Sequence, residues 1–157
     1  ARVIFESYET LGYNYRMTDM QAAMGRVQLG RLPDILTRRR ALAALYTERL
    51  AAIGVTPPSE PEWARSNWQS YCVTLPERAD QIEIMQALLD RNISTRRGVM
   101  NTHLEPAYVH AGSFRTSGDL ANSEWAQNRS VILPLFVQMS DDDVHYVVEE
   151  LAAALAV

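Results

Sequence analysis

The sequence predicts an α/β chain of the α+β kind, in which long helices precede a small mixed sheet with packed helices. The apolar residues recur first at helical spacing and then in short runs, so the order reads helix-helix, then β-α-β, then α-β-α. Three of the helical segments begin with residues that are typical of helix caps. With 157 residues, of which 47% are hydrophobic, the chain can bury one core.

The first third of the chain is predicted to be helical. Thr18 and Gln21 fit a capping box, in which each side chain satisfies a backbone N–H of the other residue. A helix rich in small and apolar residues follows. Pro33 suits the first turn of a new helix, which is expected over 33–52, and Gly54 ends it.

The remainder alternates strands and helices. Residues 103–118 are expected to be irregular. The last helix is predicted to begin after Ser140, with three aspartates in its first turn that suit the positive end of the helix dipole. The expected strands cover 68–75, 93–96 and 131–133. A helix over 80–91 is expected before the second strand, and a helix over 119–128 before the third.

The composition excludes several functions. The net charge is −4 and all fifteen basic residues are arginine, so no concentrated basic footprint for nucleic acid is evident. The chain has no lysine, which excludes a Schiff base on its own side chains. Cys72 is the single cysteine, so a reducing, cytoplasmic setting fits best. No apolar run approaches the roughly 20 residues that span a bilayer.

Residues 12–23 carry the most specific motif, Gly-Tyr-Asn-Tyr-Arg-Met-Thr-Asp-Met-Gln-Ala-Ala. This run resembles the G-x-N-x-R-[ML]-x-[DE]-x-Q-A-A signature of the pyridoxal-phosphate-dependent sugar aminotransferases of the DegT/DnrJ/StrS type. The similarity continues, in the order of that family, through 28–32, 38–40, 93–96, 103–108, 133–135 and 140–143.

The resemblance implies the carboxyl-terminal portion of a type I pyridoxal phosphate (PLP) aminotransferase, following the large cofactor domain. It further implies a homodimer, a nucleotide-sugar substrate and a Schiff-base lysine upstream of the signature. We therefore expect inter-domain or dimer-contact helices over residues 1–54 and a small C-terminal αβ domain over 55–157. No catalytic residue is expected in this chain, and PLP is not expected to be held covalently by it.

Two cofactor-binding residues are carried over from the signature. The resemblance implies that Asn14 reaches the cofactor phosphate of the other subunit, where its amide N–H₂ would donate to a phosphate oxygen. Alternatively, Asn14 only shapes the turn before the helix. Arg16 would meet a phosphate of the cofactor or substrate, or would instead pair with Asp19.

Four substrate-binding residues are expected near the nucleotide-sugar. Arg96 matches the arginine of the family's T-R segment, and either it or Arg97 would bind diphosphate. His103 and Tyr108 fall on matching positions, although a lone histidine in an irregular loop is more often structural. The segment 98–102 departs from the family pattern, which leaves the substrate undefined.

Other features have simpler explanations. The three histidines lack metal-ligand spacing, so no metal site is predicted. The run 38–40 of three arginines is most simply a solvated helix face.

The leading hypothesis is that the chain is a segment of an aminotransferase that moves an amino group from glutamate or glutamine to a keto-sugar nucleotide. The segment alone is expected to be inactive because the Schiff-base lysine is absent from it. The alternative is a stand-alone dimerisation or partner-binding module. That alternative predicts polar residues on the faces that a large domain would otherwise cover.

Overall fold

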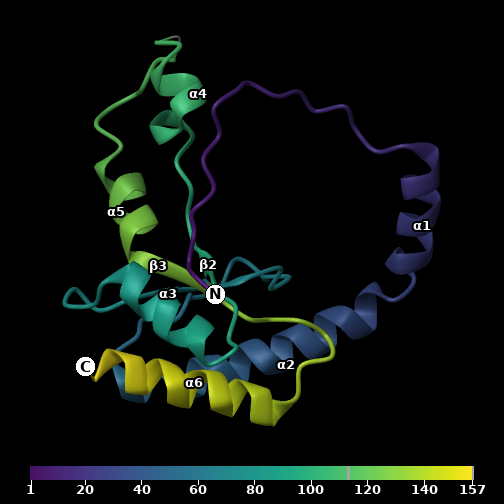
Figure 1. The fold of residues 1–157 in the computed structure, drawn as a ribbon. Coiled ribbons are helices and arrows are strands. Elements are labelled where there is room, and N and C mark those ends of the chain that lie inside the picture. The colour runs from purple at the N-terminus through teal and green to yellow at the C-terminus, as the bar shows by residue number, and fades with distance from the viewer. Residues whose placement is uncertain (113, 157) are drawn as a thin grey trace.

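The computed structural model describes residues 1–112 and 114–156. Figure 1 shows α2, α3 and α6 gathered around the sheet, while the segment before α1 arches away from them. The elements, in chain order, are α1 Asp19–Leu29, α2 Leu32–Leu50, the 3₁₀ turn Ala51–Ile53, β1 Tyr71–Thr74, α3 Gln81–Asp90, β2 Arg96–Arg97, the 3₁₀ turn Thr102–Leu104, α4 Pro106–Val109, α5 Ala121–Arg129, β3 Ser130–Leu133 and α6 Asp141–Leu155.

Helix α1 is specified locally. Its predicted capping box is confirmed, because Gln21 N donates to Thr18 Oγ1 over 3.3 Å and Thr18 N donates to Gln21 Oε1 over 2.8 Å. None of its residues is buried, and Met20 and Met24 are 79% and 71% exposed. Capping and backbone hydrogen bonds therefore define this helix without any tertiary packing.

Helix α2 belongs to the core over its second half only. Pro33 lies in its first turn, as predicted, and the αL conformation of Gly54 (φ 74°) follows the 3₁₀ turn at its end. Leu42, Tyr46 and Leu50 are fully buried and α2 packs against α6. The core thus includes residues on both sides of residue 54, and the division there stays a prediction.

The sheet differs from the expected mixed one. Its order is β1-β3-β2, and both pairings in the described part of the chain are antiparallel, with Tyr71 opposite Leu133 and Arg96 opposite Ile132. The expected β1-α3-β2 unit is present, but β3 lies between its two strands and hydrogen-bonds to each. The parallel strands therefore never pair with one another.

Two stacked tyrosines lie at the centre of the core. The rings of Tyr46 and Tyr71 are 5.0 Å apart at an interplanar angle of 24°, and both side chains are fully buried. Each hydroxyl has a partner, because Tyr46 Oη donates to the Pro134 carbonyl over 3.0 Å and Tyr71 Oη bonds Thr47 Oγ1 over 2.7 Å. These bonds offset the cost of burying the phenols.

The remaining differences are local. Strand β2 is shorter than expected and begins three residues later, at Arg96–Arg97. The segment expected to be irregular contains the short helix α4, Pro106–Val109, with Pro106 in its first turn. No helix in residues 1–112 or 114–156 combines the length and apolar character needed to cross a membrane.

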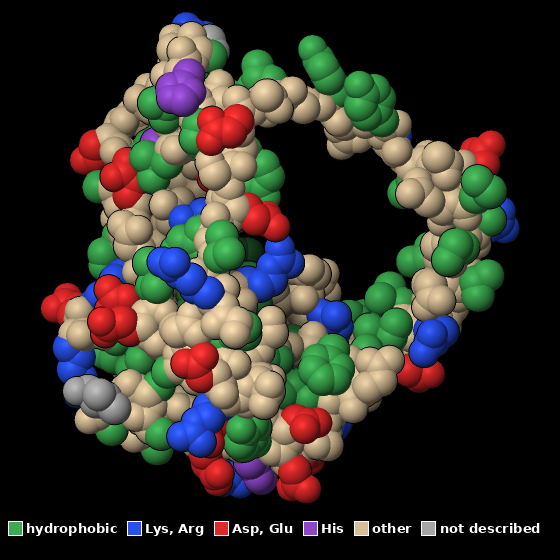
Figure 2. All heavy atoms as spheres, in the orientation of Figure 1, with side chains coloured by type: hydrophobic (Ala, Val, Ile, Leu, Met, Phe, Trp, Pro, Cys, Tyr) green, Lys and Arg blue, Asp and Glu red, His purple; other side chains and the backbone are tan. Residues whose placement is uncertain are grey.

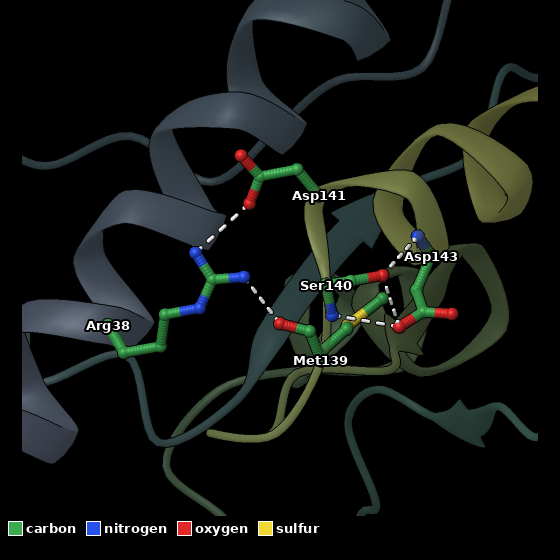
Figure 3. A network of polar contacts seen from close by, with 5 residues as sticks. All are labelled: Arg38, Met139, Ser140, Asp141 and Asp143. Atoms are coloured by element: carbon green, nitrogen blue, oxygen red, sulfur yellow. Dashed lines mark hydrogen bonds and ion pairs between the residues drawn. The ribbon is translucent and has the colours of Figure 1, made fainter.

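Arg38 fastens α2 to the start of α6 (Figure 3). Its guanidinium bonds the Met139 carbonyl through Nη2 and lies 3.0 Å from Asp141 Oδ1 through Nη1. In the same turn, Ser140 and Asp143 form the predicted cap, with Asp143 N donating to Ser140 Oγ over 3.1 Å. Arg38 therefore connects α2 to the first turn of α6, beside the α6 cap.

The other two arginines of the run hold the loop before β1. Arg39 Nη1 donates to the carbonyls of Trp68 and Gln69, both over 2.7 Å, and Arg40 donates to the Ser66 carbonyl over 3.3 Å. The prediction of a solvated helix face was wrong, because the loop folds back along α2 and presents backbone carbonyls to these side chains.

Trp68 lies in the left-handed region, with φ 47°. For a residue other than glycine this conformation costs about 1–2 kcal/mol. Arg39 donates hydrogen bonds to the carbonyls of Trp68 and Gln69. The centroid of the Trp68 indole lies 5.6 Å from that of the Tyr71 ring. Hydrogen bonds and core packing together stabilise this turn.

Candidate functional site

A cavity of about 760 Å³ lies where the N-terminal segment crosses the sheet beside β2. One part of its wall is polar and cationic, and another is apolar. The lining residues are Ile4, Phe5, Glu6, Gln69, Ser70, Met85, Ser94, Thr95, Arg96, Arg97, Gly98, Met100, Ile132, Leu133, Pro134 and Leu135.

Arg97 is the most distinctive group in this cavity. Its guanidinium lies over the ring of Phe5, with the central carbon 4.6 Å from the ring centroid, which is a cation–π geometry. The side chain is half-buried, and among the described residues it has no hydrogen-bond partner and no carboxylate within 4 Å. A half-buried cation without a counter-charge favours an incoming anion.

Arg96 has different surroundings, because successive side chains of a strand point to opposite faces. It is exposed, and its charge lowers the pKa of Tyr8. The hydrogen bond that Tyr8 donates to Glu6 has a larger effect and raises the pKa of Tyr8, so this pKa lies above its ordinary value. Arg96 and Arg97 thus line one cavity but differ in exposure and neighbours.

Gly98 allows the end of β2 to pack closely against β3. Its N–H donates to the Ser130 carbonyl over 3.0 Å, and the backbone lies directly against the side chains of Ser130 and Cys72. Burial raises the pKa of the Cys72 thiol, and a hydrogen bond with Ser130 acts against that shift. The residue at which the sequence leaves the family pattern is therefore one where only glycine fits.

Buried amides support the chain beyond Gly98. Asn101 N donates to Gln127 Oε1 over 2.8 Å, and Asn101 Nδ2 donates to the Ser123 carbonyl over 3.0 Å. Gln81 Nε2 donates to the carbonyls of Gln127 and Ser130 over 2.8 and 2.7 Å. This network joins α3, α5 and β3 and fixes the segment that follows β2.

His103 and Tyr108 lie away from the two arginines. His103 Nε2 is 3.0 Å from Glu124 Oε1, and the histidine is half-buried beside α5. Tyr108 lines a second cavity of about 290 Å³, together with Tyr8, Gly12 and others, and only Met100 lines both cavities. The substrate-binding roles of His103 and Tyr108 stay predictions.

Asn14 and Arg16 form a turn on the arch before α1. Arg16 N donates to Asn14 Oδ1 over 2.9 Å, and Arg16 has φ 64°. Both are exposed, and among the described residues Arg16 makes no ion pair with Asp19. Asn14 thus shapes the turn through its oxygen, while its N–H₂ group makes no hydrogen bond to another described residue.

Asn14 and Arg16 could contact the phosphate of PLP but could not hold PLP covalently. A phosphate needs donors, which the Asn14 amide and the Arg16 guanidinium supply. A covalent attachment needs a lysine, and the chain contains none. The residues present therefore fit a phosphate contact and not the covalent bond. Within the described ranges no group of three or more His, Cys, Asp or Glu could hold a metal ion.

Among the residues of the cavity wall, sequence reasoning named Arg96 and Arg97 and missed the others, which include Phe5, Gln69 and Ser70. Phe5 was recognised only as apolar, and Gln69 and Ser70 were assigned to a strand without any functional role. Nothing in the local sequence distinguishes them, because Phe5 reaches the cavity through the course of the N-terminal segment, and Gln69 and Ser70 reach it through the loop before β1.

The arch and α1 carry an exposed apolar surface. Figure 2 shows hydrophobic side chains protruding along both segments. Contiguous exposed apolar surface is typical of interaction sites. Its members, each more than half exposed, are Leu11, Tyr13, Tyr15, Met17, Met20, Met24, Val27 and Leu29.

Comparison with known proteins gives consistent matches. The model of the DegT/DnrJ/EryC1/StrS aminotransferase family matches residues 3–152. Uncharacterized protein MJ1066 of Methanocaldococcus jannaschii is 32% identical over 139 residues, which are 85% of this chain and 35% of that protein.

Solved structures agree with the family match. The aminotransferase TlmJ from Streptoalloteichus hindustanus superposes with a TM-score of 0.75 at 32% identity, over 88% of this chain and 36% of that one. Spr1654 from Streptococcus pneumoniae, solved in a PLP form, has a TM-score of 0.76 at 28% identity, over 90% and 36%. The chain therefore spans about a third of the length of the relatives it matches, and it belongs to the DegT/DnrJ/EryC1/StrS aminotransferase family.

Proposed function

We propose that this chain is the carboxyl-terminal segment of a PLP-dependent aminotransferase that transfers an amino group from glutamate or glutamine to a keto-sugar nucleotide. The observation that supports it most is the cavity beside β2 in a chain of this family, where Arg97 has no carboxylate within 4 Å among the described residues. A diphosphate is an anion that suits a guanidinium of this kind.

In this proposal the residues of the chain bind and orient, and none performs the covalent chemistry. PLP, when bound, supplies the electron sink for amino transfer. Because the chain has no lysine, the Schiff-base lysine comes from an upstream large domain, and the segment alone is inactive.

The carried-over residues take separate roles. Arg97 and Arg96 bind the diphosphate of the nucleotide-sugar, and His103 and Tyr108 border the substrate. Asn14 donates its amide N–H₂ to the cofactor phosphate of the other subunit of a homodimer, and Arg16 adds a positive charge there. The position of Asn14 on the arch, away from Arg97, supports a role in a second subunit rather than in its own.

The exposed apolar surface supports an enzyme segment over a stand-alone module. An independent module should carry polar residues along α1, whereas Met20, Met24 and Val27 are each at least 70% exposed. We therefore assign residues 1–54 to contacts with the large domain and the second subunit, and residues 55–157 to the small domain. A cytoplasmic location accompanies this proposal.

The first test is the size of the native polypeptide in source cells, measured by immunoblot with an antibody raised against this chain. A band of more than twice the mass of the chain is expected. That longer polypeptide should transfer an amino group from glutamate to a keto-sugar nucleotide, and Asn14→Ala should weaken its PLP binding. A band at the mass of this chain, with no lysine-bearing partner that restores transfer on mixing, would refute the proposal.

A further inference from the structure

Arg39 fixes a turn of unusual backbone geometry at the edge of the cavity. Its Nη1 donates to two consecutive carbonyls, those of Trp68 and Gln69, each over 2.7 Å. Trp68, whose carbonyl is the first of the two, has a left-handed backbone with φ 47°. The carbonyls of this turn therefore point towards α2. The two residues that follow Trp68 become part of the cavity wall.

Those two residues are Gln69 and Ser70, and both line the cavity that also contains Arg96 and Arg97. Neither the Gln69 amide group nor the Ser70 hydroxyl makes a hydrogen bond to another residue in the described part of the chain, although the Gln69 backbone bonds both Arg39 and Asn67. Neutral donors and acceptors beside a cationic group suit a ligand that combines an anion with hydroxyl groups.

We propose that Gln69 and Ser70 form a neutral hydrogen-bonding subsite of this cavity, which takes the hydroxyl-bearing part of a ligand whose anionic part meets Arg97, and that Arg39 is the positioning residue of this subsite. The proposal rests on the proposed function only for the identity of the ligand. The subsite itself rests on the Arg39 contacts and the cavity wall.

The neighbouring arginine gives a matched control. Arg40 leaves the same helix one residue later and donates to the Ser66 carbonyl of the same loop, over 3.3 Å. Ser66 does not line the cavity. Loss of the Arg40 contact therefore removes a bond to the same loop and leaves the two Arg39 bonds to Trp68 and Gln69 in place.

The experiment compares two probes by titration calorimetry on the 157-residue chain, UDP-glucose and UDP. They share the diphosphate and differ in the sugar hydroxyls. Ser70→Ala and Arg39→Lys should weaken UDP-glucose binding about 3- to 10-fold, as expected for one lost hydrogen bond, and should leave UDP binding unchanged. Lysine cannot reproduce the contacts of one planar guanidinium with two carbonyls. Arg40→Lys should change neither affinity.

Several outcomes would overturn the proposal. They are equal binding of UDP and UDP-glucose to the parent chain, no binding of UDP-glucose, equal losses in Arg39→Lys and Arg40→Lys, or no effect of Ser70→Ala. Urea midpoints show whether Arg39→Lys remains folded, and Ser70→Ala provides the second variant if it does not. Binding requires no amino transfer, so the subsite and the proposed transferase activity can fail separately.

Discussion

Gly98 and Ser130 lie so close together that no side chain fits between them. A Cβ on Gly98 would stand 2.3 Å from Ser130 Oγ and 2.5 Å from Cys72 Sγ. The same glycine donates its N–H to the Ser130 carbonyl. The end of β2 therefore stays beside β3, and Arg97 beside the cavity, only because residue 98 has no side chain.

Gly98→Ala should destabilise the fold by about 1–3 kcal/mol, because the added methyl group overpacks a closed contact. The free energy of unfolding in urea measures this. Ser130→Ala in the same chain should recover part of the loss, since it removes Ser130 Oγ, the nearest of the clashing atoms. Gly25→Ala is the control, because nothing lies within 4 Å of its Cβ position. Equal effects of the two glycine substitutions would refute the packing argument.

Gln81→Glu should destabilise the fold strongly at neutral pH and less in acid. Gln81 Nε2 donates to the carbonyls of Gln127 and Ser130, and a carboxylate in its place offers no donor to either. Burial and the two carbonyls would raise the pKa of the new carboxyl group, and its protonated form can donate one bond.

The urea midpoint of Gln81→Glu relative to the parent should accordingly approach the parent value as pH falls through that raised pKa. Gln81→Met, which has no titratable group, should lose stability to the same extent at each pH. A deficit of Gln81→Glu that does not change with pH would exclude the donor role.

Asp143 should contribute to acid unfolding. Hydrogen bonds from the backbone and side chain of Ser140 hold the pKa of its carboxyl below the ordinary value. The unfolded chain therefore binds the proton first, near its pKa of about 3.9, and stability falls as pH drops from there through the folded-state pKa.

Below about pH 4 the urea midpoint of the parent falls with pH. In Asp143→Asn the midpoint should depend less on pH over this range. Asp142→Asn changes the same helical turn at a side chain that makes no hydrogen bond to a described residue, so it should leave the curve as steep as in the parent. A curve of parental steepness in Asp143→Asn would show that the cap carries no pH dependence.

Tyr46 should make the fold sensitive to alkali. Burial, together with the neighbouring Tyr71 and Asp143, raises the pKa of its phenol well above the ordinary value. Above about pH 10 the unfolded chain loses this proton and the folded chain retains it, so stability falls as pH rises. Tyr46→Phe should reduce that fall and cost about 1 kcal/mol at neutral pH, through the lost bond to Pro134.

Urea midpoints between neutral pH and pH 11 measure this effect. Tyr13→Phe is the control, because Tyr13 is 81% exposed. If both substitutions changed the alkaline slope alike, general charge repulsion rather than the buried phenol would be the cause.

The elements that sequence predicted well are those with local causes. The caps at Thr18, Asp80 and Ser140 are all present, because each depends on a side chain and a backbone N–H within three residues. The insertion of β3 between β1 and β2 has no local signal. It depends on hydrogen bonds between segments far apart in the chain, and the short strands fit either arrangement.

The candidate site divides in the same way. The family resemblance pointed to Arg96, with Arg97 beside it, and both residues line the cavity. It gave no indication that Phe5 would lie over Arg97 or that Arg39 would hold the loop before β1. Whether Asn14 meets a phosphate depends on a second subunit and stays a prediction.

By itself, the sequence determined the family, the starts of the three capped helices and the lack of an internal lysine nucleophile, because these follow from residue identity and contacts within a few positions. Tertiary structure alone decided the strand order, the roles of the three arginines and the composition of the cavity wall. Those features arise where loops return to α2 and β3 and leave carbonyls and side chains without local partners. Such long-range pairing depends on which groups the whole fold brings within hydrogen-bonding distance.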